Sequence, residues 1–146
     1  MALFERILCA VDFDGNSITA LRMAKRIAQR EEGTLWVVHV VPPVDPLVIS
    51  APLLSRRKED EARAELARLA REELPAVQHQ TMLLFGQPAD EIVNAAGETK
   101  ADLIVLATHG RRGVAHMILG SVAEKVVREA NCPVLTVRIG PDGSAA

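Results

Sequence analysis

The fold is decided by the stretch Asp102-Leu103-Ile104-Val105-Leu106, which continues as Ala107-Thr108-His109-Gly110. The apolar run predicts a strand that is buried on both faces, and its end predicts a glycine-containing loop. After nine further residues, Gly120-Ser121 predicts the start of a helix. Backbone N–H groups at a helix start can bind phosphate, and the loop also carries Arg111 and Arg112. The stretch therefore indicates a nucleotide site beside a central strand.

Strand and helix signals alternate along the rest of the chain, which predicts the α/β class. The predicted strands are Ile7–Val11, Leu35–Val41, Val77–Phe85, Leu103–Ala107 and Val134–Arg138. Because the first and fourth are the most apolar, we expect them side by side at the centre of a single open parallel sheet. That placement predicts the order 3-2-1-4-5 with helices on both faces, a Rossmann-like arrangement.

Helical periodicity predicts one helix in each gap between strands. We expect Asn16 or Ser17 to cap the first helix and Gly33 to end it. The second is predicted at Arg56–Leu74, after an irregular segment from Pro42 to about Ser55 whose four prolines argue against regular helix. The third follows Gly86 and Pro88, the fourth follows Gly120, and the tail from Gly140 to Ala146 is predicted to fray.

The predicted topology brings two distant segments into one crevice. In open parallel sheets, ligands bind beyond the carboxyl ends of the strands, where the winding direction reverses. Here that point lies between the first and fourth strands, so Asp12 and the segment from Ala107 to Gly110 converge on it.

Composition narrows the class of protein. The chain has 146 residues, which predicts one domain over 1–146, and its net charge is −2 with only 3% aromatic residues. We therefore expect no nucleic acid partner and no membrane partner. No stretch resembles a membrane span or a secretion signal, so the expected location is the cytoplasm. Cys9 and Cys132 are interpreted as buried thiols.

Several motifs of nucleotide and metal sites are absent from the sequence, including the Walker loop and G-x-G-x-x-G after the first strand. The histidines show no metal-ligand spacing. His39 is interpreted as a hydrogen-bonded core residue, whereas His109 and His116 are candidates for ligand contact.

Each part of the opening motif also has a purely structural interpretation. Ser121-Val122-Ala123-Glu124 matches a capping box, in which Ser121 would be the N-cap. Gly110 and Gly113 are compatible with a flexible loop, and Asp12 is compatible with a turn. The combination is more specific than any one of these parts.

The pattern G-x2-G-x9-G-[ST] after the fourth strand resembles that of the universal stress protein family, in its ATP-binding branch. Ala107 to Gly110, then Arg111 to Leu119, then Gly120-Ser121 carry the resemblance here, with Ala107 in place of the first glycine. The segments Arg6 to Asp12, His39 to Val41 and Ala130 to Leu135 are also similar to that family. The resemblance implies a fold like that of the adenine nucleotide alpha hydrolases.

The resemblance further implies which residues bind ATP, with Mg²⁺ as a candidate counter-ion. Asp12 would hold the ribose, backbone near Val40 would meet the adenine, and Arg111 lies in the phosphate loop. We expect Ala107 to be tolerated because a strand end accepts a side chain. The implied nucleotide-binding residues are Ala10, Val11, Asp12, Val40, Ala107, Gly110, Arg111, Gly120, Ser121 and Val122.

The resemblance also implies a homodimer that pairs through the last strand, at Val134, Leu135, Thr136 and Val137. An exposed apolar edge strand is best covered, which favours the same arrangement. The leading hypothesis is a stress-response binding protein that signals through ATP occupancy, with at most slow hydrolysis and no catalytic residues. The alternatives are a nucleotide-free member that acts through an unknown protein partner, and a phosphatase of the D-x-D-G type using Asp12 and Asp14.

Overall fold

Five parallel strands form one sheet in the order β3-β2-β1-β4-β5, which confirms the predicted topology. The computed structural model describes residues 2–108 and 119–138. The predicted frayed tail lies outside these residues. The elements are β1 Arg6–Ala10, α1 Gly15–Glu31, β2 Thr34–Val41, α2 Ala51–Glu73, β3 His79–Phe85, α3 Pro88–Thr99, β4 Leu103–Ala107, α4 Ser121–Glu129 and β5 Val134–Val137.

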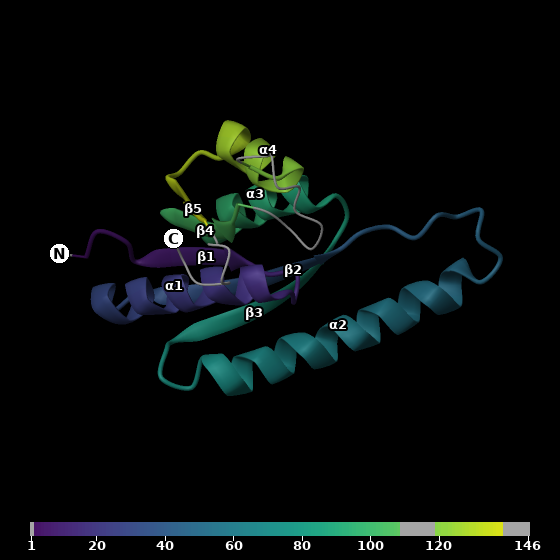
Figure 1. The fold of residues 1–146 in the computed structure, drawn as a ribbon, viewed down its shortest axis with the longest axis horizontal. Helices are drawn as coiled ribbons and strands as arrows, with labels where there is room; N and C mark the ends of the chain where they lie inside the picture. The colour runs from purple at the N-terminus through teal and green to yellow at the C-terminus, as the bar shows by residue number, and fades with distance from the viewer. Residues whose placement is uncertain (1, 109–118, 139–146) are drawn as a thin grey trace.

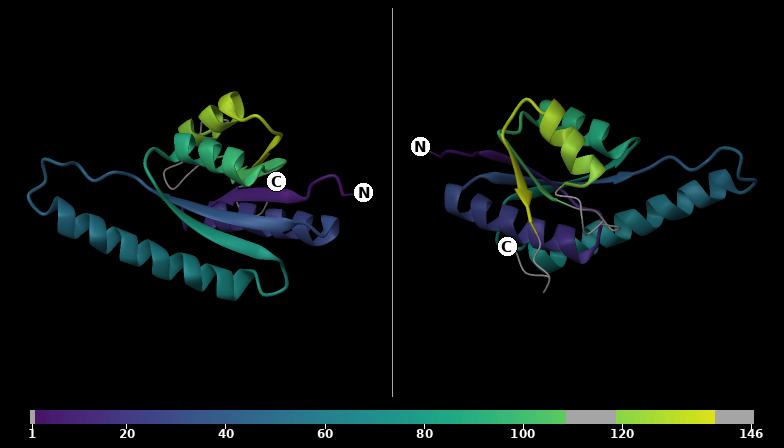
Figure 2. Two further views of the ribbon diagram at one scale, coloured as in Figure 1. Left: turned by 180° about the vertical axis from the view of Figure 1, so that it is seen from behind. Right: turned by 45° about the horizontal axis from the view of Figure 1, so that its top comes forward.

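Helices cover both faces of the sheet, with α1 and α2 on one face and α3 and α4 on the other (Figures 1 and 2). Successive side chains of a strand point to opposite faces, so β1 supplies both cores. Ile7 and Cys9 pack under α1, whereas Leu8 packs under α3 and α4. All three are fully buried, which is why this strand has a continuous apolar sequence.

The start of α1 differs from the prediction. Its N-cap is Asp14, whose carboxylate accepts the backbone N–H of Ser17 at 3.0 Å, and not Asn16 or Ser17. Asp14 has extended backbone, as an N-cap residue requires, whereas Ser17 already lies inside the helix. The helix ends as predicted just before Gly33, through Glu32 in the left-handed conformation at φ 54°.

Helix α2 begins at Ala51, so the prediction of an irregular segment as far as Ser55 was wrong. Pro52 lies in the first turn of the helix, where no N–H group is needed for an intrahelical bond. The irregular segment shrinks to residues 42–50. This segment and the first turns of α2 form an arm, residues 42–61, that projects beyond the end of the sheet (Figure 1).

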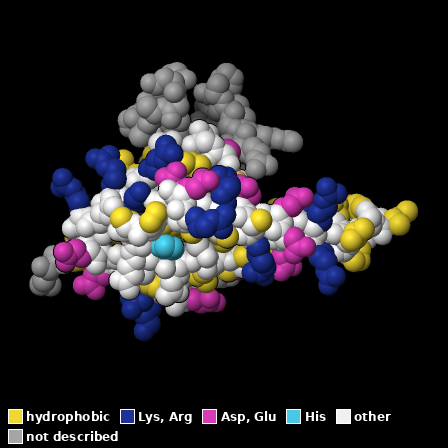
Figure 3. Space-filling model, turned by 90° about the horizontal axis from the view of Figure 1, so that it is seen from below, with side chains coloured by type: hydrophobic (Ala, Val, Ile, Leu, Met, Phe, Trp, Pro, Cys, Tyr) yellow, Lys and Arg dark blue, Asp and Glu magenta, His cyan; other side chains and the backbone are white. Residues whose placement is uncertain are grey.

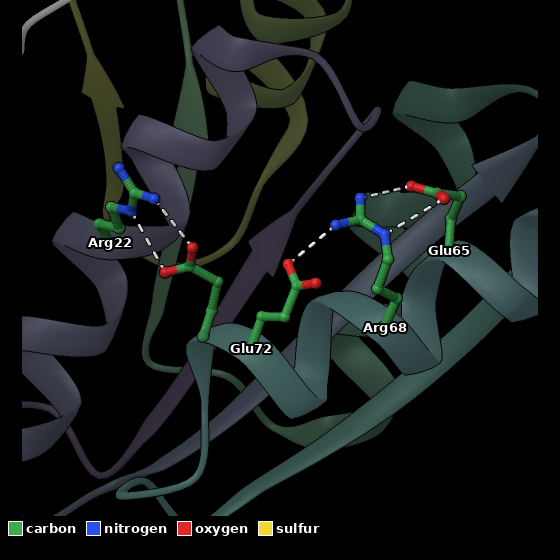
Figure 4. A network of polar contacts seen from close by, with 5 residues as sticks. Arg22, Glu65, Arg68 and Glu72 are labelled. Carbon is green, nitrogen blue, oxygen red and sulfur yellow. Dashed lines mark hydrogen bonds and ion pairs between the residues drawn. The ribbon is translucent and has the colours of Figure 1, made fainter.

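The C-terminal half of α2 packs against the rest of the protein. Leu66 and Leu69 are buried in the core beneath it. Glu73 accepts two hydrogen bonds from Arg22 of α1, at 2.9 and 3.2 Å. Figure 4 shows Arg22 pointing toward α2, beside the Arg68 network of that helix. Helix α2 is thus anchored at its C-terminal end and unsupported at its N-terminal end.

The start of α4 also differs from the prediction. Gly120 is the N-cap and Ser121 is the first helical residue, with no side-chain capping bond, so the predicted capping box does not form. A Ser hydroxyl caps a helix only from the N-cap position itself. The Glu124 carboxylate instead accepts a hydrogen bond from Arg128 at 2.7 Å, one turn along the helix.

Candidate functional site

A crevice of about 980 Å³ opens beyond the carboxyl ends of β1, β2 and β4, at the position that the topology predicted. Its volume lies at the upper end of the range for small-molecule sites, about 300–1,000 Å³. Eight of the predicted nucleotide-binding residues line it, namely Ala10, Val11, Asp12, Val40, Ala107, Gly120, Ser121 and Val122. The predicted residues Gly110 and Arg111 lie outside the described residues, as do His109, Arg112, Gly113 and His116.

The turn after β1 forms the acidic corner of the crevice. The Asp12 N–H donates to Ser17 Oγ at 3.2 Å, and the Ser17 hydroxyl donates to the Asp14 carbonyl at 3.1 Å. The Asp12 carboxylate accepts the Asp14 N–H at 3.2 Å. These bonds hold Asp12 at the mouth of the crevice, half-buried, while Phe13 between the two acids adopts a φ of 68°.

The two carboxylates in this turn differ in role. Desolvation raises the pKa of Asp14, and the neighbouring charge of Asp12 raises it further, although the Ser17 N–H opposes both effects. Asp14 is engaged in capping α1, and Asp12 lines the crevice. The carboxylates are therefore not an equivalent pair aimed at one substrate atom.

His39 is hydrogen-bonded, as predicted, but it is not enclosed in the core. Its Nδ1 lies 2.6 Å from the Val11 carbonyl oxygen, and its ring lies 4.2 Å from that of Phe13. The side chain is half-buried and lines the crevice. His39 and Phe13 therefore form an aromatic corner of the site that the strand pattern alone does not indicate.

Strand β2 extends beyond the end of β1 at the base of the crevice. The last register pair of the two strands is Ala10 with Val38, and the Val11 N–H still donates to the Val38 carbonyl at 2.9 Å. In a parallel strand, every second residue directs both its N–H and its C=O to the same neighbouring strand. Val40, like Val38, therefore directs these two groups to the β1 side. Opposite Val40 the β1 chain has already turned away. Its N–H and C=O therefore face the crevice as an adjacent donor and acceptor.

The end of β4 and the start of α4 form the opposite wall. The Gly120 N–H donates to the Thr108 carbonyl, and the Thr108 N–H donates to the Val137 carbonyl at 3.0 Å. The first turn of α4 lines the crevice from Gly120 to Ala123. N–H groups in a first helical turn lack intrahelical partners, so this wall presents donors and the positive end of the helix dipole.

Helix α2 supplies a charged wall that the sequence interpretation missed. Lys58, Glu61 and Glu65 line the crevice at the i, i+3 and i+7 spacing of one helix face. The Glu61 carboxylate accepts a hydrogen bond from Arg57 Nε at 3.2 Å. Among the residues that the structure describes, Lys58 makes no ion pair.

Glu65 is neutralised by its own helix. Its carboxylate accepts hydrogen bonds from Arg68 at 2.7 and 3.3 Å, and Arg68 also donates to Glu72 at 2.8 Å, as Figure 4 shows. The hydrogen bond from Arg68 lowers the pKa of Glu65. Because both acids on this wall have arginine partners, the Lys58 charge is the one that this wall leaves available to an anion.

Neither cysteine belongs to the crevice lining. Burial raises the pKa of Cys9 to about 12, which agrees with the predicted buried thiol. Cys132 is only half-buried, so that part of the prediction was wrong: it lies in the turn between α4 and β5 and not inside a strand of the sheet. Within 2–108 and 119–138, no three His, Cys, Asp or Glu side chains are grouped closely enough to hold a metal ion.

No helix in the described part of the chain is both long and apolar enough to cross a membrane.

Comparison with known proteins identifies relatives over nearly the whole chain. The model of the universal stress protein family matches residues 3–138. A universal stress protein of Thermus aquaticus is 42% identical over 141 residues, covering 93% of this chain and 100% of the relative. The structure of MJ0577 from Methanocaldococcus jannaschii superposes with a TM-score of 0.86, at 24% identity, over 95% of this chain and 99% of that chain.

Two similar solved structures are described as nucleotide complexes. One is a universal stress protein in complex with cAMP, with a TM-score of 0.63 and 27% identity over 92% of this chain and 98% of its own. The other is a universal stress protein from Archaeoglobus fulgidus in complex with dAMP, with a TM-score of 0.63 and 26% identity over 92% and 98% of the two chains.

Proposed function

The chain belongs to the universal stress protein family, and on that premise we propose that its crevice binds an adenine nucleotide, with ATP as the ligand. The observation that carries this proposal is the backbone of Val40, which lines the base of the crevice and points to the β1 side beyond the last residue pair of β1 and β2. An adenine edge carries a donor beside an acceptor, which complements the adjacent N–H and C=O of one residue. The cAMP and dAMP complexes of similar proteins support an adenine nucleotide as the class of ligand.

The lining residues suit the three parts of such a ligand. Val40 would bind the adenine through its backbone, and Asp12 would accept hydrogen bonds from the ribose hydroxyls. The first turn of α4, at Ser121 and Val122, would face the phosphates together with the loop that carries Gly110 and Arg111. Mg²⁺ would offset phosphate charge when bound with the nucleotide.

We assign this site a binding role in a stress response, in which nucleotide occupancy is the signal and hydrolysis is slow at most. Asp14 is committed to the cap of α1, and its raised pKa reflects burial and its acidic neighbour. The phosphatase alternative would need further carboxylates at the end of β4, where the sequence places Ala107 and Thr108.

The proposal includes a homodimer that pairs through β5. The carbonyls of Pro133 and Val137 accept hydrogen bonds from the β4 side, so the alternate residues Val134 and Thr136 direct their backbone groups to the open edge. Leu135 on the same strand is partly exposed. A second copy of β5 would satisfy these backbone groups and cover the edge.

The direct test is to denature the purified protein and identify any small molecule that is released. We expect ATP or ADP, and we expect added ATP to raise the melting temperature of nucleotide-free protein. A protein that releases no nucleotide and shows no thermal shift with ATP, ADP or AMP contradicts the proposed ligand class. That result would favour a family member that acts only through protein partners.

Replacement of Gly120 tests where the phosphates lie. Gly120→Val places a branched side chain at the start of α4, where phosphate would approach the backbone. We expect ATP affinity in isothermal titration calorimetry to fall by about tenfold or more, with the oligomeric state unchanged.

The matched control is Gly97→Val, in α3, because a Cβ at that position meets nothing within 4 Å. This variant should bind ATP as the wild type does. Normal binding by Gly120→Val would show that the phosphates lie elsewhere.

A further inference from the structure

The end of the arm is an uncharged and strongly exposed apolar tip. The ten residues 46–55, here called the tip, carry no charged side chain. Within it Leu47 is 88% exposed, Ile49 is 102% exposed and Leu53 is 71% exposed. Figure 3 shows hydrophobic side chains gathered at this extreme end of the molecule, away from the sheet. Large apolar side chains concentrated at a protruding end mark a binding surface.

Part of the tip backbone is hydrogen-bonded within the arm itself. The Leu47 N–H donates to Asp45 Oδ1 at 2.9 Å, and the Val48 N–H donates to the Asp45 carbonyl at 3.1 Å. The Ala51 N–H donates to the Val48 carbonyl at 3.0 Å, and the Leu54 N–H donates to the Ser50 carbonyl at 2.8 Å. Pro46 and Pro52 have no N–H to satisfy. These bonds reduce the cost of moving the tip into an apolar medium.

Cations follow directly behind the apolar side chains. Arg56 and Arg57 lie three and four residues after Leu53, and therefore on the same face of α2, one turn farther from the tip. Figure 3 shows Lys and Arg side chains immediately behind the hydrophobic end. Both arginines are exposed, and Arg57 also pairs with Glu61 at 3.2 Å.

We propose that the tip docks on the surface of an anionic lipid bilayer. Leu47, Ile49 and Leu53 insert between the lipid headgroups, and Arg56 and Arg57 meet the lipid phosphates one turn above. A protruding loop with an apolar apex and a basic second layer matches the depth profile of a membrane interface. A protein partner would instead require an apolar groove with an acidic rim. The charge order along the arm and the internal hydrogen bonds of part of its apex favour the bilayer.

The overall charge of the chain does not oppose this local attraction. The chain as a whole carries −2, which argued against a general membrane affinity. Charges act over roughly 8–10 Å at physiological ionic strength, so the tip responds mainly to its own neighbours. Along the arm from the apex these are first Arg56, Arg57 and Lys58 and then Glu59, Asp60 and Glu61, with Asp45 on the preceding segment, so the cations lie nearer the apex than the acids of α2.

Cosedimentation of the full chain with extruded vesicles tests the proposal. The vesicles are pure phosphatidylcholine or phosphatidylcholine and phosphatidylglycerol at about 3:1. We expect partitioning to be about tenfold or more stronger with the anionic vesicles, and to weaken as salt is raised. Leu47→Ser combined with Ile49→Ser and Leu53→Ser should lower binding to the anionic vesicles by about tenfold or more. Arg56→Gln combined with Arg57→Gln should remove only the preference for anionic lipid.

Matched controls separate the tip from general surface effects. Leu3→Ser removes an apolar side chain that is 73% exposed elsewhere, and Arg26→Gln with Arg30→Gln removes two exposed cations of α1. Both controls should bind vesicles as the wild type does. All variants should keep the wild-type melting temperature, since every replaced side chain is exposed.

Three results would overturn the proposal. The first is a wild-type chain that does not sediment with anionic vesicles. The second is an equal loss of binding in the controls. The third is a triple tip variant that leaves vesicle binding unchanged but alters the mass of the protein in light scattering, which would make the tip a contact between copies of the chain.

Discussion

Gly33 shows how one missing side chain sets the junction between α1 and β2. A Cβ at this position would lie 2.9 Å from the Phe4 carbonyl oxygen and 3.0 Å from that of Glu5. The Thr34 N–H donates to the Glu5 carbonyl at 2.9 Å, so the chain must pass this close to start pairing with β1. Glycine is needed here for close approach, and not for a positive φ.

A pair of glycine replacements tests this interpretation. Gly33→Ala should lower the free energy of unfolding by about 1–3 kcal/mol, because two backbone carbonyls must move away from the new methyl group. Gly97→Ala should raise it by about 0.5–1 kcal/mol, because that position in α3 is open and alanine favours helix. Urea denaturation measures both, and equal effects at the two sites would refute the close-approach interpretation.

The single departure from the glycine pattern, Ala107, has a simple backbone explanation. Ala107 is the last residue of β4 and is in register with Val137 of β5. It is not among the residues with positive φ. The backbone there is ordinary strand that accepts a methyl group, which agrees with the expected tolerance of alanine.

Among the elements, α1 begins in a more strained way than its sequence suggests. The capping carboxylate of Asp14 lies beside that of Asp12, so one helix start carries two acids close together. The pKa of Asp14 is raised from its ordinary value of 3.8, first by desolvation and then by Asp12. Folding therefore favours the protonated form, and this contribution to stability is present below pH 3.8 and is lost as the pH rises through the folded-state pKa.

Two replacements of Asp14 separate the cap from the charge. Asp14→Ala should cost about 1 kcal/mol of unfolding free energy at pH 7, because the Ser17 N–H loses its acceptor. Asp14→Asn keeps an acceptor without the charge, and should gain on the order of 0.5 kcal/mol at pH 7 after solvent screening. That gain should vanish near pH 3, where the wild-type carboxyl is protonated. Thermal melts at the two pH values measure it, and a larger gain at pH 3 would contradict the sign of the shift.

For the molecule as a whole, the two edges of the sheet and the arm decide what the protein can bind. Strands β3 and β5 are the edges, and α2 extends past the sheet as the arm. The crevice lies between these features, with one wall from α2 and the opposite wall from α4. Nucleotide, second copy and membrane are thus proposed for the crevice, the β5 edge and the tip, and Lys58 and Glu61 of the arm also line the crevice.

The proposed dimer is tested by proline in the edge strand. Thr136 directs its N–H to the open edge, so Thr136→Pro should leave the β4 pairing intact and yield a monomer. Light scattering should give the mass of two chains for the wild type and of one chain for the variant, with unchanged circular dichroism.

Leu135→Pro is the contrasting variant, because the alternation directs the Leu135 N–H toward β4, and it should destabilise the fold itself. A Thr136→Pro protein that stays dimeric would place the interface elsewhere.

Local sequence patterns predicted most of the fold but only part of the candidate site. The segments Leu103–Leu106 and Ile7–Cys9 are entirely apolar, which places their strands at the centre of the sheet, because only strands covered on both faces lack polar positions. With the strand order known, Asp12 and Ala107 must meet at one end of the sheet. The caps of α1 and α4 were wrong because each depends on backbone angles at a single residue.

By itself, the sequence determined the α/β class, the strand order and the crevice at the ends of β1 and β4, because hydrophobic periodicity is a local property that survives in every context. Only the tertiary structure decided that β2 extends beyond the end of β1, so that the backbone of Val40 is not paired with β1. It also decided that Lys58 of α2 lines the same crevice and that the tip projects away from the rest of the protein. Those features depend on the relative lengths and angles of elements distant in the chain. Packing, and not residue preference, sets both.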